Sequence, residues 1–152
     1  MTACQDSSDI KIEDYTESFY DSVRRLAEEC GVEGFTDQIA GYSQIKKVAL
    51  LGGALVGYIA FLFLFDQGDI CTVCVHEKYR RMKIASRLLE DVLNSGKSQG
   101  VKTFHIEVRS GNAPAIALYG KHGFKVTGSI KNYYRNPTED ALLMEKDENT
   151  CV

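Results

Sequence analysis

The sequence has little excess of charge of either sign. Its 18 Lys and Arg residues oppose 21 Asp and Glu residues, which gives a formal net charge of -3 at pH 7. Because a chain with this balance has no overall electrostatic attraction to nucleic acid or to an anionic membrane, we expect neither as a partner. An anion site would have to be a local cluster of basic side chains. Lys78, Arg80, Arg81 and Lys83 form such a cluster.

Signs of secretion and of several domains are also missing. The N-terminus has neither the charged start nor the apolar run of a signal peptide. The five cysteines are odd in number and scattered, which disfavours a secreted disulfide framework. No internal repeat, linker or low-complexity tract interrupts a sequence that is 44% hydrophobic. We therefore expect one globular domain over residues 1–152, located in the reducing cytoplasm.

No metal site is expected. Cys71 and Cys74 form a Cys-x-x-Cys motif, but the surrounding segment DICTVCVH is typical of an extended strand. Residues three apart in a strand point to opposite faces, which places the two thiols on different sides. No second Cys or His pair lies nearby in the sequence to complete four ligands. We interpret both cysteines as core thiols.

An uncharged stretch at residues 48–65 is long enough to raise the question of a transmembrane helix. Gly52 and Gly53 divide it into VALL and ALVGYIAFLFLF, and a Gly-Gly pair between two apolar runs is typical of a hairpin turn. A second turn signal follows at residues 66–69, before a third strand that ends near Val75. We favour buried antiparallel strands over a membrane span.

The remaining periodicity predicts strands that alternate with helices. Apolar residues recur at helical spacing from Phe19 to Cys30 and again from Ile84 to Leu93. We assign the second of these helices to about residues 81–94, with Ser95-Gly96 as its stop. Further expected elements are strands at residues 10–13, 125–130 and 141–145, a short helix at residues 33–42, and a polar loop through Asn136-Pro137.

The stretch EVRSGNAPAIALYGKHGF, residues 107–124, is the most informative part of the chain. Alternating apolar residues predict a strand over residues 101–108, with Glu107 at its end and on its polar face. Asn112 is the expected N-cap of a following short helix, and Gly123 supplies the left-handed residue that closes it. This helix carries Tyr119 near its exit. The order predicts a carboxylate and a phenol on adjacent elements.

The segment YRRMKIAS, residues 79–86, opens a helix directly after a strand. Backbone N–H groups at a helix start lack intrahelical partners and lie at the positive end of the helix dipole, so a pyrophosphate can bind there. Basic side chains would reinforce such a site. The alternative is a solvated basic helix start without a ligand.

Together, these motifs resemble the GCN5-related N-acetyltransferases. The likeness rests on Arg80-x-x-Lys83-x-Ala85, Glu107-Val108-Arg109, Asn112, Ala117-Leu118-Tyr119 and Gly123-Phe124. Within that family the chain is similar to the RimI-type enzymes, which acetylate the N-terminal alanine of a small-subunit ribosomal protein, because it also has Asn132-Tyr133-Tyr134 and the segment EDALLM. The order and spacing of the motifs make the resemblance specific, over about the second half of the chain.

The resemblance implies an α/β fold with a mixed, mostly antiparallel central sheet flanked by helices. Acetyl-CoA would lie where two central strands separate. Backbone groups of Val73, Cys74 and Val75 would line its acetyl and pantetheine arm, and Asn112 would hydrogen bond the same arm. The pyrophosphate would be held by Arg81, Met82, Lys83, Ile84, Ala85 and Ser86.

The resemblance also implies the catalytic residues. Glu107 would be the general base and Tyr119 the proton donor to the departing thiolate, while Tyr133 and Tyr134 would border the acceptor peptide. An N-terminal amine, with a pKa of about 8, loses its proton more easily than lysine at about 10.4, so Glu107 needs little assistance. We expect direct attack by a protein or peptide N-terminus, such as that of a ribosomal protein.

Plain structural interpretations stand beside these roles. Glu107 can be a solvated carboxylate, Tyr119 a core aromatic residue, and Tyr133-Tyr134 a pair packed over the sheet edge. His105 shares a face with Glu107 and is a candidate second base, although we favour a structural role for it. The alternatives for the whole protein are an acetyltransferase for a small-molecule amine or a lysine side chain, and a non-catalytic acyl-CoA-binding module.

Two features depart from the family pattern. The family usually has Gly where this chain has Lys83, whose side chain either narrows the phosphate loop or contacts a phosphate through its ammonium group. The chain has no Trp, so the usual tryptophan-bearing substrate loop is absent, and Gly34-Phe35-Thr36 occupies that region. The sequence therefore leaves the identity of the acceptor amine open.

Overall fold

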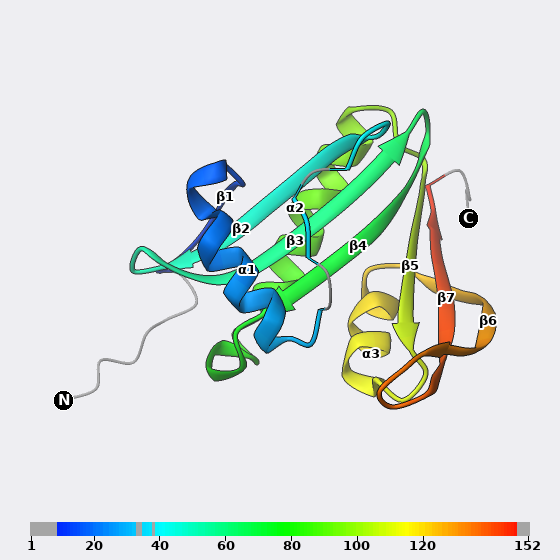
Figure 1. Cartoon of the computed structure of the whole chain (residues 1–152). Coiled ribbons are helices and arrows are strands. Elements are labelled where there is room, and N and C mark those ends of the chain that lie inside the picture. The colour runs from blue at the N-terminus through cyan, green and yellow to red at the C-terminus, as the bar shows by residue number, and fades with distance from the viewer. Residues whose placement is uncertain (1–8, 33–34, 38, 149–152) are drawn as a thin grey trace.

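A computed structural model describes residues 9–32, 35–37 and 39–148 (Figure 1). Its centre is a seven-stranded sheet with the order β1-β2-β3-β4-β5-β7-β6, in which only the β4–β5 pair is parallel. The expected mixed, mostly antiparallel sheet is confirmed. The strands are β1 (Ile10–Asp14), β2 (Ser43–Leu51), β3 (Ala54–Leu64), β4 (Gln67–Val75), β5 (Thr103–Arg109), β6 (Lys125–Tyr134) and β7 (Glu139–Asp147).

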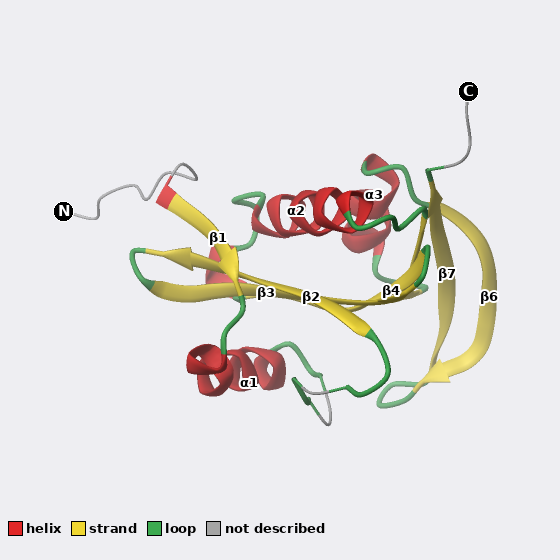
Figure 2. Ribbon diagram, turned by 90° about the horizontal axis from the view of Figure 1, so that it is seen from above, coloured by secondary structure: helices red, strands yellow, loops and turns green. Residues whose placement is uncertain are grey.

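Helices cover both faces of this sheet (Figure 2). On one face, α1 (Tyr20–Glu29) packs Val23, Leu26 and Ala27 against Tyr58 of β3 and Cys74 of β4. On the other face lie α2 (Ile84–Ser98) and α3 (Ala113–Lys121), of which α2 buries a continuous apolar stripe in the larger core. The helices fix the sheet because each buried aliphatic or aromatic side chain contributes about 1.5–3 kcal/mol.

The apolar stretch at residues 48–65 forms the β2–β3 hairpin. Gly52 and Gly53 make its turn with φ values of 59° and 84°, a conformation that glycine adopts without steric cost. The strands read as continuous apolar runs because both of their faces are covered. Within the described ranges, no helix has both the length and the apolar character that a membrane crossing requires.

The β4–β5 pair is short, and the two strands separate beyond it. They pair only from Gln67↔Thr103 to Ile70↔Ile106. Cys71 is an extra residue on β4, since Ile70 pairs with Phe61 while Thr72 pairs with Ala60. A bulge of this kind bends its strand. We call the diverging ends, residues 71–75 and 107–109, the β4–β5 fork (Figure 1).

The short helix expected at residues 33–42 is wrong for the described part of that segment, which is coil and turn. Residues 33, 34 and 38 lie outside the described residues. Asp37 is held by other elements, because Tyr15 donates a hydrogen bond of 2.6 Å to its carboxylate and Lys46 donates one of 2.7 Å to its carbonyl oxygen. Phe35 packs on Tyr20 and Tyr58. Tertiary contacts fix this loop.

The predicted bounds of α2 are also wrong. The helix begins at Ile84 because Arg81 and Lys83 have positive φ values of 73° and 60°, which a right-handed helix excludes. It continues through Gly96 to Ser98, since the missing side chain at Gly96 makes room for Phe104 of β5. Near the C-terminus, β6 is longer than expected and carries Tyr133 and Tyr134 on a strand.

Candidate active site

The fork leaves backbone groups of β4 unpaired. Within the β3–β4 ladder, His76 donates to Val56 O at 2.8 Å and Cys74 lies opposite Tyr58. Because hydrogen-bonded pairs alternate along an antiparallel ladder, the N–H and C=O groups of Val73 and Val75 point away from β3. Of these four groups, the Val75 carbonyl oxygen accepts a hydrogen bond of 3.8 Å from Cys30 Sγ. Val73 and Val75 were expected to line the acetyl and pantetheine arm. The same expectation for Cys74 is wrong, because its backbone groups face Tyr58 of β3.

Cys74 is a core thiol, as predicted, but Cys71 is not. Contact with Cys30 and burial raise the pKa of the Cys74 thiol, so Cys74 stays neutral. Cys71 is exposed, because the bulge turns it out of the core. Partial desolvation beside the sheet and the carboxylates of Asp69 and Glu107 raise the pKa of the Cys71 thiol. In the described ranges no group of three His, Cys, Asp or Glu side chains converges on a metal site.

The start of α2 is an anion-binding arrangement. No residue in the described part of the chain accepts a hydrogen bond from the backbone N–H groups of residues 81–86, and the first intrahelical bond runs from Arg87 N to Lys83 O at 3.1 Å. Two left-handed residues in this loop turn successive N–H groups toward one side, where the helix dipole adds positive potential. The residues therefore fit a pyrophosphate.

The backbone of Lys83 has the left-handed conformation that is usually found at glycine. Lys83 is the N-cap of α2, with φ 60° and ψ 26°, and it makes no side-chain capping hydrogen bond. A non-glycine residue costs about 1–2 kcal/mol in this conformation. Ser86 differs from its neighbours because its hydroxyl lies 2.8 Å from His122 Nε2, which joins the first turn of α2 to the end of α3.

Glu107 lies on the α1 face of the sheet, two residues before the end of β5. Its exposed carboxylate is close to both tyrosines of β6. Contact with Glu107 and its negative charge raise the pKa of Tyr133 to about 12. Burial and the same carboxylate raise the pKa of Tyr134. Glu107 thus combines an exposed carboxylate with a neighbouring phenol that can hold it in place.

Tyr119 lies on α3 and belongs to the buried core, with 7% of its surface exposed. Burial, with smaller effects of Tyr134 and Cys74, raises its pKa to about 12. Within the described residues the Tyr119 hydroxyl forms no hydrogen bond, and no buried side-chain oxygen or nitrogen lacks a partner. The hydroxyl oxygen therefore reaches the surface on the side of Tyr134 and Cys74. Its proton is available throughout the neutral pH range.

Asn112 is the N-cap of α3, as the sequence predicted. Its Oδ1 accepts a hydrogen bond of 3.3 Å from Ala115 N. The cap uses only the carbonyl oxygen, so the amide nitrogen is free to donate to a ligand. Gly123, with φ 93°, ends the helix as expected.

The histidines have structural partners. His105 lies 3.3 Å from Gln67 Oε1 and 3.6 Å from Glu145, its partner in the β5–β7 register, which agrees with the structural role favoured for it. His76 accepts a hydrogen bond from Lys78 N at 3.2 Å. His122 is paired with Ser86 of α2.

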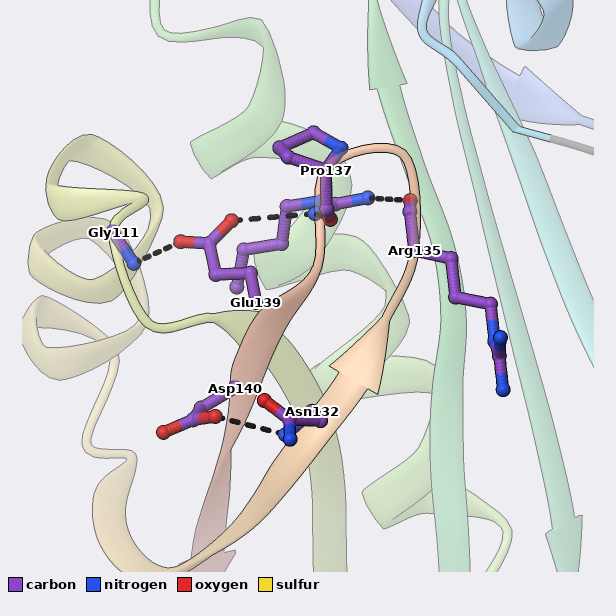
Figure 3. Close-up of polar contacts among 7 residues, drawn as sticks. Gly111, Asn132, Arg135, Pro137, Glu139 and Asp140 are labelled. Carbon is purple, nitrogen blue, oxygen red and sulfur yellow. Dashed lines mark hydrogen bonds and ion pairs between the residues drawn. The ribbon is translucent and has the colours of Figure 1, made fainter.

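A set of contacts beside the tyrosines was missed (Figure 3). Arg109 Nη1 donates to Pro137 O at 3.0 Å and pairs with Glu139 Oε1 at 3.3 Å, while Arg109 Nη2 donates to Arg135 O at 3.2 Å. Glu139 Oε2 accepts from Gly111 N at 2.6 Å. Arg109 belongs to the motif Glu107-Val108-Arg109 that the sequence analysis identified. Its contacts could not be predicted, because the β5–β7 register brings its partners to it from a distant part of the chain.

Comparison with known proteins agrees with this geometry. The model of the acetyltransferase (GNAT) family matches residues 5–124. An N-alpha-acetyltransferase of Saccharolobus solfataricus is 34% identical over 125 residues, 74% of each chain. A putative [ribosomal protein bS18]-alanine N-acetyltransferase of Bacillus subtilis is 33% identical over 105 residues, 69% of this chain and 67% of the relative.

A solved structure has the same architecture. Arabidopsis thaliana Naa50, in complex with the bisubstrate analogue CoA-Ac-MVNAL, superposes with a TM-score of 0.80 and 25% identity, over 91% of this chain and 99% of the other. The resemblance seen in the sequence is confirmed over more of the chain than its second half, since the family match includes α1 and the first four strands. The chain belongs to the acetyltransferase (GNAT) family.

Proposed function

We propose that this acetyltransferase moves the acetyl group of acetyl-CoA to the α-amino group of a protein N-terminus, by direct attack in a ternary complex. One observation carries the proposal. Glu107 of the β4–β5 fork raises the pKa of Tyr134 on β6, and Tyr134 raises that of Tyr119, although Glu107 and Tyr119 lie on opposite faces of the sheet. The names of the relatives from S. solfataricus and B. subtilis support an N-terminal acceptor.

Acetyl-CoA binding is assigned to unpaired groups around the fork. The free N–H groups of residues 81–86 would hold the pyrophosphate, with the Lys83 ammonium as a further phosphate contact. The outward N–H and C=O groups of Val73 and the outward N–H group of Val75 would bind the pantetheine arm, and the amide nitrogen of Asn112 would donate to it. An N–H group on β4 would also polarise the acetyl carbonyl.

Proton transfer is assigned to two side chains. The acceptor amine must be neutral to attack, so Glu107 takes its proton, directly or through one water. As the carbon–sulfur bond breaks, Tyr119 donates its phenolic proton to the departing thiolate. The raised pKa of Tyr119, about 12, keeps that proton in place until it is needed.

The acceptor side is assigned to β6. Tyr133 is 46% exposed and lies beside Glu107. Tyr134 interacts electrostatically with both Glu107 and Tyr119. Aromatic side chains in this position would border the first residues of a peptide while the amine approaches from the α1 face. The proposal includes a single catalytic domain over residues 1–152 and a cytoplasmic location, where acetyl-CoA and nascent N-termini meet.

Mass spectrometry of acetylated peptides tests the function. The purified protein is incubated with acetyl-CoA and a set of peptides that differ in their first two residues, some ending in free amines and some N-terminally formylated. We expect acetyl transfer to free α-amines, including peptides that begin with Ala. Formylated peptides that contain lysine should stay unmodified.

Two outcomes would contradict the proposal. Acetylation of lysine side chains or of polyamines, with untouched peptide N-termini, would identify a different acceptor. Tight binding of CoA with no turnover on any amine would make the protein a non-catalytic acyl-CoA-binding module.

A further inference from the structure

We propose that Arg109 is a positioning residue for the acceptor, because it fixes the turn that directly follows Tyr133 and Tyr134 at the end of β6. The turn between β6 and β7 has no regular ladder, since pairing stops at Tyr134↔Glu139. Arg109 reaches into it from the end of β5 and donates to two of its carbonyl oxygens, those of Arg135 and Pro137, at 3.2 and 3.0 Å. A planar guanidinium can bind two such acceptors with one rigid group.

Glu139 completes this brace, by which we mean the Arg109–Glu139 pair. One carboxylate oxygen lies 3.3 Å from Arg109 Nη1, and the other accepts a hydrogen bond of 2.6 Å from Gly111 N (Figure 3). Gly111 has no side chain, and a Cβ atom there would stand 2.6 Å from Glu139 Oε2. The brace therefore joins the β6–β7 turn to the loop that precedes Asn112 and α3.

Tyr133 lies within a bulge of β6, and Tyr134 is the first paired residue after it. Between the pairs Ile130↔Ala141 and Tyr134↔Glu139, β6 has three residues where β7 has one, Asp140. Asp140 Oδ1 accepts a hydrogen bond of 2.8 Å from Asn132 N, which holds the bulge from within (Figure 3). A bulge re-aims the side chains next to it. The bulge thus sets the direction of Tyr133, and the brace contacts Tyr134 directly after it.

The brace also touches the second tyrosine. The guanidinium carbon of Arg109 lies 4.5 Å from the centre of the Tyr134 ring, and the Tyr133 and Tyr134 rings meet edge to face at 5.1 Å. Tyr133 in turn lies beside Glu107, two residues before Arg109 on β5. The position of both tyrosines relative to Glu107 therefore depends on Arg109.

This inference rests on the proposed function for its kinetic test. Arg109→Gln removes the guanidinium and should raise the KM for an acceptor peptide roughly ten- to one-hundred-fold, since small misplacements of bound groups are costly in rate. The dissociation constant for acetyl-CoA and the melting temperature should change little. Arg109→Lys keeps the positive charge but lacks the planar guanidinium that binds two carbonyl oxygens. Its acceptor KM should therefore stay closer to that of Arg109→Gln than to that of the wild type.

Arg135→Gln is the matched control. It removes the same charge from the same turn, but the Arg135 side chain points away from the brace, to which Arg135 contributes only its carbonyl oxygen (Figure 3). The acceptor KM of this variant should stay within about twofold of the wild-type value. Equal increases in KM for Arg109→Gln and Arg135→Gln would show that positive charge alone matters, and would overturn the positioning role.

A second measurement does not depend on catalysis. The peptide bond after Arg135 is a trypsin site in the turn, and its carbonyl oxygen is held by Arg109. Limited trypsin digestion, followed by mass spectrometry, should cut this bond at least several-fold faster in Arg109→Gln than in the wild type. Glu139→Gln should produce a smaller increase, because the two carbonyl contacts of Arg109 remain.

The kinetic and the proteolytic measurements test the proposed function and the Arg109–Glu139 brace separately. If the wild type does not acetylate peptide N-termini, the proposed function fails, and faster trypsin cleavage still supports the brace. An unchanged cleavage rate in Arg109→Gln, together with an unchanged acceptor KM on any amine that the wild type acetylates, would sink the inference.

Discussion

Gly96 of α2 lies directly against the ring of Phe104 on β5. A Cβ atom built at Gly96 would stand 2.8 Å from Phe104 Cε1 and 3.4 Å from Phe61 Cε1. The two rings are themselves packed together, with centroids 5.2 Å apart. The close approach of α2 to β5 at this point depends on the absence of one methyl group.

Gly96→Ala should therefore destabilise the protein by about 1–3 kcal/mol, the usual cost of overpacking a core. In an open helix the same change stabilises by about 0.5–1 kcal/mol. Gly120→Ala in α3 is the control, since a Cβ atom there meets nothing within 4 Å. Urea denaturation should give opposite signs for the two variants. A stabilised Gly96→Ala protein would show that α2 does not pack this tightly on β5.

Glu107→Gln and Tyr119→Phe should lower kcat by roughly ten- to ten-thousand-fold while acetyl-CoA binding stays nearly intact. The phenylalanine variant should fold normally, since the Tyr119 hydroxyl forms no hydrogen bond within the described residues. Steady-state kinetics and calorimetric titration measure the two effects separately. Full activity of both variants between pH 6 and 9 would remove these residues from the mechanism.

Lys83→Gly should have opposite effects on folding and on binding. Without ligand the variant should be about 1 kcal/mol more stable, because glycine relieves the left-handed conformation at φ 60°. Its affinity for acetyl-CoA should fall with the loss of the ammonium group, and Lys83→Met should bind more weakly still while gaining no stability. Tighter binding of the glycine variant at both low and high salt would mean that Lys83 only crowds the phosphate loop.

Alkaline pH should unfold the wild type more readily than Tyr119→Phe. Burial raises the pKa of Tyr119 to about 12, whereas the unfolded chain releases this proton at about 10. Below pH 10 both states keep the proton and the residue makes no difference. Between pH 10 and 12 the unfolded state ionises first, so the free energy of unfolding falls by about 1.4 kcal/mol per pH unit. Urea midpoints at pH 8, 10 and 11 should show a flatter decline in the variant.

The sequence predicted those parts of the fold that depend on local rules. The alternation of apolar residues predicted the buried face of β5, and Gly52-Gly53 predicted the β2–β3 turn. Asn112 and Gly123 predicted the two ends of α3. These predictions succeeded because caps and turns are formed by residues that are close in the sequence. The N–H groups at the start of α2 that have no acceptor among the described residues were also expected, because every helix start leaves such groups unpaired. The predicted bounds of α2 were wrong for two reasons. Lys83 has a left-handed backbone conformation that lysine disfavours, and Gly96 is needed for close packing on Phe104 of β5 and does not end the helix.

The acceptor side of the site could not be predicted in the same way. Tyr133 and Tyr134 were placed in it by resemblance, and the sequence alone assigned no role to Arg109 or Glu139. Their contacts depend on the β5–β7 register and on a bulge in β6, which are properties of distant pairing. Long-range register is set by the whole core, so no local motif encodes it.

The fork has a further consequence, for solubility. Unpaired strand backbone normally lies at the rim of a sheet, where another chain can add to it and begin aggregation. Here the free groups of β4 lie in the interior of the strand order, between β3 and β5, and helices cover both faces of the sheet (Figure 2). A second protein therefore finds no rim at the fork along which to pair, because the rims of this sheet are β1 and β6. The bulge at Cys71 thus supplies unpaired backbone groups without creating an edge that other chains can extend.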